Sequence, residues 1–175
     1  MVFLKFTPIV CDLYIIIFAI NAHKLGLEIA LALNDTIEIV QALNNLGTNF
    51  RRIGAHKEAS QYHYQALYYV EAWSGLHTPT GTKNRVMSLN GIGNINLMLG
   101  YYNDAEKQFR EALKNEIALK SPIGQAINYA NLGSIFELRQ QYDSAYVYYQ
   151  KSLGQNKLDR QNILPEYTYL NTTTI

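Results

Sequence analysis

The sequence has very little cysteine. Its 175 residues include one, Cys11, and a single thiol can form neither an intramolecular disulfide nor a cluster of cysteine ligands. The four histidines are accompanied by no HExxH, no Gly-x-Ser-x-Gly and no phosphate-binding loop. We therefore expect no enzyme, no catalytic residue, no cofactor and no metal site.

The sequence also lacks an excess of charge of either sign. Fifteen basic and fourteen acidic residues give a formal net charge of +1, so no global field draws the chain to nucleic acid or to an anionic bilayer. We expect a protein or peptide partner, recognised locally, and no direct nucleic-acid binding.

Long hydrophobic runs are scarce as well. The uninterrupted apolar run Leu13–Ile20 is far shorter than the roughly 20 residues of a spanning helix, and we expect no membrane span. Residues 1–22 have two interpretations, a secretory signal or a packed helix. The cellular location stays open, with the cytoplasm favoured over export.

What the sequence does contain is a repeat. The segments GAHKEASQYHYQAL (54–67), GYYNDAEKQFREAL (100–113) and QQYDSAYVYYQKSL (140–153) share an alanine, an aromatic or histidine, a small residue and a leucine at matching places. NNLGTNF, GIGNIN and ANLGSIF precede them, with Gly47, Gly93 and Gly133 at equivalent positions. The glycine intervals of 46 and 40 residues are typical of stacked helical hairpins.

The repeat divides the chain. We expect a single domain over 1–175, with a degenerate or partial repeat at 1–36, repeats at 37–73, 86–119 and 126–157, an inserted loop at 74–85, and the start of an incomplete repeat at 158–175. The loop is predicted from two glycines and a proline. The unfinished ends indicate a fragment or truncated relative of a longer repeat protein, with possible self-association through those ends.

Local signals predict two further features. Each repeat glycine is expected to meet the alanine of the following helix (Gly47 with Ala59, Gly93 with Ala105, Gly133 with Ala145), so that the two helices approach closely. Asn103 is expected to cap its helix, with Glu106 three places on.

These motifs resemble the tetratricopeptide repeat, in its longer variant of about 40 residues found in bacterial regulatory proteins and in kinesin light chain. The resemblance covers about residues 37–157 and departs from the family at His63, Asn96 and Gln140. It implies an all-α fold, a right-handed superhelix (α-solenoid) of stacked antiparallel helix pairs, with a concave groove lined by the first helix of each pair.

The resemblance also implies that ligands contact the non-core face of the first helices. The candidate peptide-binding residues on that face are Asn44, Asn45, Thr48, Arg51, Asn90, Asn94, Asn131 and Ser134. Side-chain amides donate and accept hydrogen bonds at once, which suits the backbone of an extended peptide.

Two functions follow as expectations. The chain is a protein-protein interaction module that binds an extended peptide or partner protein in the groove. Alternatively, it is the sensor or regulatory arm of a larger bacterial signalling protein whose kinase or DNA-binding output domain is not in this chain.

Overall fold

The protein is a stack of helices. A computed structural model describes the backbone of residues 8–168 and the side chains of residues 13–157. Its elements are α1 (Pro8–Leu33), α2 (Thr36–Arg52), α3 (His56–Ala72), α4 (Pro79–Met98), α5 (Tyr102–Ala118), α6 (Pro122–Leu138) and α7 (Tyr142–Thr168). Residues 8–168 contain no strand.

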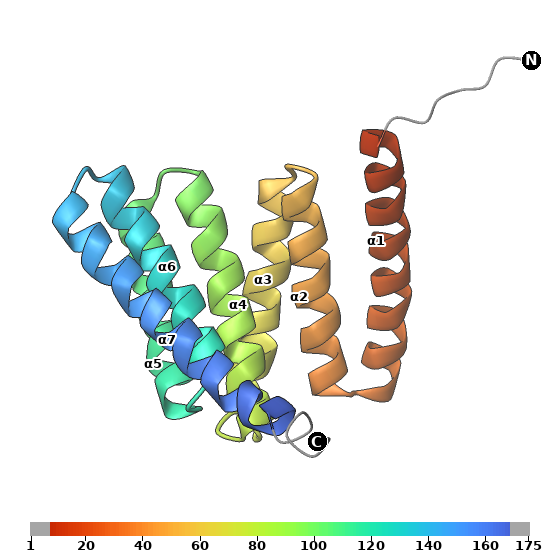
Figure 1. Ribbon diagram of the computed structural model, residues 1–175. Coiled ribbons are helices and arrows are strands. Elements are labelled where there is room, and N and C mark those ends of the chain that lie inside the picture. The colour runs from red at the N-terminus through yellow and green to blue at the C-terminus, as the bar shows by residue number, and fades with distance from the viewer. Residues whose placement is uncertain (1–7, 169–175) are drawn as a thin grey trace, which may run out of the picture.

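Each helix packs on its neighbours in the chain. The most extensive contacts join α2 to α3, α4 to α5 and α6 to α7, and each pair then packs on the next. Successive helices run in opposite directions across the molecule (Figure 1). The fold is thus the predicted all-α solenoid of antiparallel helix pairs.

Side-chain caps fix where the first helices begin. Asp35 accepts hydrogen bonds from two backbone amides at the start of α2, while Thr78 and Ser121 each accept one at the starts of α4 and α6. Pro79 and Pro122 occupy the first turn, where a missing N–H costs nothing.

Residues with positive φ end these helices. Gly54 and Gly100, at φ of 80° and 81°, follow α2 and α4. The expected cap at Asn103 is wrong: Tyr101 precedes α5 without a side-chain cap, and the Asn103 side chain instead accepts a hydrogen bond from Arg139 at 2.7 Å. The Asn103 side chain, which the local sequence pattern assigns to a helix cap, therefore binds Arg139 at the C-terminal end of α6 instead.

The repeat glycines do not pack where the sequence predicts. A Cβ at Gly47 would lie 2.6 Å from the ring of His63, and Cβ atoms at Gly93 and Gly133 would each lie 2.7 Å from a ring. Those rings belong to Phe109 and Tyr149. The glycine therefore makes room for the ring four residues after each alanine, while Ala59, Ala105 and Ala145 are simply buried.

The expected loop at 74–85 is wrong for residues 79–85, which form the first turns of α4. Only residues 73–78 connect α3 to α4. Position 81 requires glycine because the backbone of Gly75 and Leu76 passes close to it, and a Cβ there would lie 2.3 Å from the Gly75 carbonyl oxygen. The six extra residues of this repeat are shared between a longer connection and the 20-residue α4, against 17 residues in α6.

Both ends differ from the expected partial repeats. Residues 8–33 form one continuous helix with no break near residue 22, and Ile16 and Ile20 pack against Leu46 of α2. Residues 158–168 continue α7 rather than starting a new helix. Residues 1–7 and 169–175 of those predicted segments lie outside the described residues.

One stretch passes a membrane-span criterion of length and composition. It is Leu13–Leu33 of α1, with a mean hydropathy of 1.6. The expectation of no span counted only the uninterrupted run to Ile20, whereas the later residues of α1 are mostly apolar too. This is weak evidence for a span, because core helices and signal sequences meet the same criterion, and no clear membrane span is present in the described residues.

Candidate functional site

The candidate site is the first-helix face, which we define as the side of α2, α4 and α6 that points away from α3, α5 and α7. In the first two repeats α2 contacts α4 directly, while α3 and α5 do not approach each other as closely. The first-helix face is therefore the inner side of this part of the stack, where a ligand would be enclosed most.

The structure adds apolar residues to this face. Six residues before each repeat glycine stand Gln41, Met87 and Ile127, and Met87 and Ile127 are 47% and 51% exposed. Ile123, one turn before Ile127, is equally exposed. The sequence prediction began one turn later, at the asparagines, and so missed them. If the alignment of the repeats on their glycines had been extended one turn toward the N-terminus, it would have found these residues.

A cavity of about 310 Å³ opens on this face between α2 and α4. Its lining residues are Gln41, Asn45, Thr80, Lys83, Asn84 and Met87. Asn45 is the only predicted site residue among them. Amides, a hydroxyl and one ammonium provide hydrogen bonds here, and the Met87 thioether provides apolar contact.

Asn44 does not face a ligand, which corrects the prediction. Its side chain is 1% exposed and belongs to a buried network. Asn44 Nδ2 donates to Ser88 Oγ at 3.0 Å and to the Asn84 carbonyl at 3.5 Å. Its Oδ1 lies 3.0 Å from His63 Nδ1. The amide therefore links three helices, α2, α3 and α4, and its loss would leave buried groups without partners.

His63 is neutral in this network. Since Asn44 Oδ1 accepts, Nδ1 of His63 carries the proton, and Nε2 has no hydrogen-bond partner. Burial, helped by the nearby positive charge of Arg51, lowers the pKa of His63 from 6.5 to about 4. The predicted site residue Arg51 lies one turn after Gly47, on the side of α2 that faces α3 and His63, and so does not belong to the first-helix face.

Asn90 occupies in the second repeat the place of Asn44 in the first. Phe109 stands in the second repeat where His63 stands in the first, and the Oδ1 atom of Asn90 is buried without a hydrogen-bond partner. The predicted residues Asn94 and Asn131 are half-buried on the same face, and Thr48 is exposed. Thr48, Asn94 and Asn131, with Asn45, are the predicted residues that the structure leaves on the first-helix face, whereas Asn90 stands at the inward position of Asn44.

Ser134 is held by its own repeat. It lies 3.2 Å from the Tyr149 hydroxyl, which donates to Glu137 at 2.6 Å. Burial and the hydrogen bond to the Glu137 carboxylate together raise the pKa of Tyr149. Because the Tyr149 proton goes to Glu137, the Ser134 hydroxyl donates to the Tyr149 oxygen, and only its acceptor lone pairs are left for a ligand.

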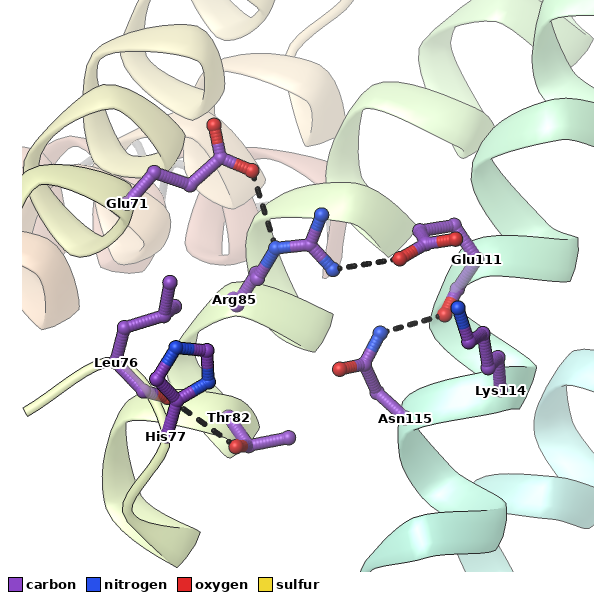
Figure 2. Close-up of a pocket in the computed structure, with 8 residues that line it drawn as sticks. All are labelled: Glu71, Leu76, His77, Thr82, Arg85, Glu111, Lys114 and Asn115. Carbon is purple, nitrogen blue, oxygen red and sulfur yellow. Dashed lines mark hydrogen bonds and ion pairs between the residues drawn. The ribbon is translucent and has the colours of Figure 1, made fainter.

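A second cavity, of about 340 Å³, lies where α3, α4 and α5 meet. Figure 2 shows Arg85 of α4 at its wall, between Glu71 of α3 and Glu111 of α5. The guanidinium donates to both carboxylates at 3.0 Å, so its charge is already matched. The other polar lining residues are His77, Thr82, Lys114 and Asn115. The Arg85 pairs hold two repeats together, and this cavity is a structural junction.

Within the described residues, no group of three or more histidine, cysteine, aspartate or glutamate side chains is placed to hold a metal ion. The expectation that the chain is not an enzyme stays a prediction.

Comparison with known proteins gives a fold. No protein-family model matches the chain, and no curated protein matches it. Among solved structures, the crystal structure of BtubC (BKLC) from P. vanneervenii aligns over 82% of this chain at 19% identity, with a TM-score of 0.65. The fold is a helical-repeat solenoid.

The matched region is only part of that structure. The alignment covers 58% of the BtubC chain. The crystal structure of MamA aligns with 81% of this chain and 89% of its own at 18% identity, with a TM-score of 0.38. Helical-repeat folds of this type present extended surfaces to protein partners.

Proposed function

We propose that this chain is a protein-interaction module of the tetratricopeptide type that binds an extended peptide along its first-helix face. The observation that supports this most is the repetition of exposed side chains at equivalent places on α4 and α6, Met87 with Ile127 and Lys83 with Ile123. A surface that repeats with the helices matches a ligand that is itself periodic, as an extended chain is.

The chemistry of the face selects the kind of peptide. Half-exposed methionine and isoleucine side chains offer apolar contact, and the amides of Asn45, Asn94 and Asn131 offer donors and acceptors for a peptide backbone. Lys83 is the one cation in the cavity lining. We therefore propose an extended peptide with apolar side chains at every second residue, rather than a highly charged one.

A displayed library of random peptides tests this proposal. Sequences enriched on the full chain are expected to be rich in apolar residues, and Met87→Asp with Ile127→Asp is expected to weaken their binding at least tenfold, about 1.4 kcal/mol. The matched control is Tyr68→Asp, at an exposed aromatic of α3 on the other side of the stack. No enrichment, or equal loss with the control, would overturn the proposal.

A further inference from the structure

The exposed side of α1 carries a second apolar surface. Its residues are Ile15, Phe18, Ala22, Leu25, Ile29 and Ala32, all exposed, and we call them the α1 stripe. Their intervals of three and four residues alternate without a break, which is the a and d spacing of a coiled coil. Phe18 is 75% exposed and Leu25 59%, and a contiguous exposed apolar surface of this kind marks an interaction site.

The stripe is separate from the face that packs on α2. The buried residues Ile16, Ile20 and Ala30 occupy that other face. In Figure 1, α1 stands at the edge of the stack, beyond α2, and α2 is the one element with which it makes extensive contact. Among the described residues, nothing covers the stripe.

The stripe complements itself in one orientation. When two copies of α1 run antiparallel, Ile15 faces Ala32, Ala22 faces Leu25, and Phe18 faces Ile29, so that each alanine meets a larger side chain. A parallel pair would place alanine against alanine and phenylalanine against phenylalanine, leaving gaps and crowding in turn. Antiparallel pairing is also what a twofold axis across the helices produces.

The polar residues of α1 favour a protein surface over a lipid bilayer. Asn21, Lys24 and Glu28 lie along a single strip beside the stripe, at intervals of three and four. A spanning helix would bring this strip into lipid and would detach Ile16 and Ile20 from Leu46, at a cost for each polar group. A partner helix on the stripe leaves both the polar strip and the α2 contact undisturbed.

The stripe is also long enough. From Ile15 to Ala32 it extends about 26 Å at 1.5 Å per residue, the length of the 17-residue helices α2 and α3 that pack on each other within a repeat. We propose that a second copy of this chain covers the α1 stripe, forming a twofold dimer through antiparallel α1 helices.

Sedimentation velocity on the full chain across a dilution series tests the dimer. The expected weight-average mass is twice the monomer mass and falls toward the monomer mass on dilution. Leu25→Glu with Ile29→Glu is expected to give a monomer at every concentration with unchanged helicity, whereas the control Met87→Glu with Ile127→Glu, on the first-helix face, still dimerises. A monomeric wild type, or a dimer that survives the α1 substitutions, would overturn the proposal.

Disulfide trapping tests whether the two α1 helices run antiparallel, and it does so without adding a charge to the α1 stripe. In a Cys11→Ser background, a mixture of the Phe18→Cys and Ile29→Cys chains is expected to yield a crosslinked heterodimer on mild oxidation, while neither chain alone crosslinks. Crosslinking of Phe18→Cys with itself would show a parallel pair and contradict the proposed packing. Flotation of a monomeric wild type with phosphatidylcholine vesicles would show a lipid partner and overturn it too.

Discussion

One equivalent position holds a different aromatic ring in each of the three repeats. The ring that packs on the repeat glycine belongs to His63, Phe109 and Tyr149 in turn. The histidine bonds to Asn44, the phenylalanine makes no polar contact, and the tyrosine reaches Glu137. The shape of the site is thus kept while its polarity changes, so that each repeat has its own polar partners.

The protonation of His63 makes stability depend on pH. The unfolded chain takes up a proton near pH 6.5, while the folded chain resists it down to about pH 4. Between these values the unfolded state binds more protons, so stability falls as the pH falls. We expect a loss of roughly 3 kcal/mol between pH 7 and pH 4 from this residue. Urea unfolding at several pH values measures it.

His63→Phe is the control for this effect, because Phe109 shows that the site accepts a phenylalanine. The variant is expected to be less stable at pH 7, since Asn44 Oδ1 loses its partner, but to lack the histidine part of the pH slope. An identical slope in the two proteins would contradict the assignment.

Gly91 is required by the same histidine. A Cβ on Gly91 would lie 2.3 Å from His63 Cε1, so Gly91→Ala is expected to destabilise the fold by about 1 to 3 kcal/mol despite the better helix propensity of alanine. Gly154→Ala in α7, where nothing lies within 4 Å, is expected to stabilise by about 0.5 to 1 kcal/mol. Thermal unfolding compares them, and equal effects would refute the steric explanation.

At the residue scale, sequence alone could not separate Asn44 from Asn90. Both stand at the same place in their repeats, and only the long-range partners His63 and Ser88 bury the first. Periodicity assigns a residue to a face of its helix. It does not say which neighbour, 19 or 44 positions away, will cover that face.

At the scale of the element, the turn before α7 departs from its counterparts. Gln140 adopts φ of 61° where Gly54 and Gly100 stand in the other repeats, a conformation that costs a non-glycine residue about 1 to 2 kcal/mol. Gln140→Gly is expected to raise the free energy of unfolding by about 0.5 to 1 kcal/mol, and Gly100→Gln to lower it by a similar amount. Chemical denaturation of the pair tests this, and changes of the same sign would contradict it.

Arg85 joins three helices in a way that one substitution can probe. Arg85→Met removes its bonds to Glu71 and Glu111, and because both carboxylates are partly exposed we expect a loss of only about 1 kcal/mol. The control Lys107→Met, at an exposed cation of α5, is expected to change stability by less than about 0.5 kcal/mol. A larger effect of the control, measured by urea unfolding, would show that the junction is unimportant.

Helices and their ends were largely predictable, because caps such as Ser121 and Gly100 act within a few residues. The start of α4 was not. Gly75, Pro79 and Gly81 have loop chemistry, yet Pro79 opens the helix and Gly81 is needed for a close backbone approach. The contact that requires glycine at position 81 is made with the backbone of Gly75 and Leu76 across the turn, and local helix propensity does not include it.

At the scale of the whole molecule, the repeat determines both the stack and the surface it displays. Gly47, Gly93 and Gly133 set the register in the sequence, so the solenoid could be predicted before any contact was known. The α1 stripe could not, because its exposure depends on how α1 rotates against α2 through Ile16 and Ile20.

The most direct test of the proposed function is to map a selected peptide on the full chain by NMR. Titration is expected to shift the amide signals of α2, α4 and α6 around Asn45, Met87, Asn94 and Ile127, and to leave the exposed faces of α3 and α5 unchanged. Shifts concentrated on α3 and α5 around Tyr68 and Lys107 would contradict the account.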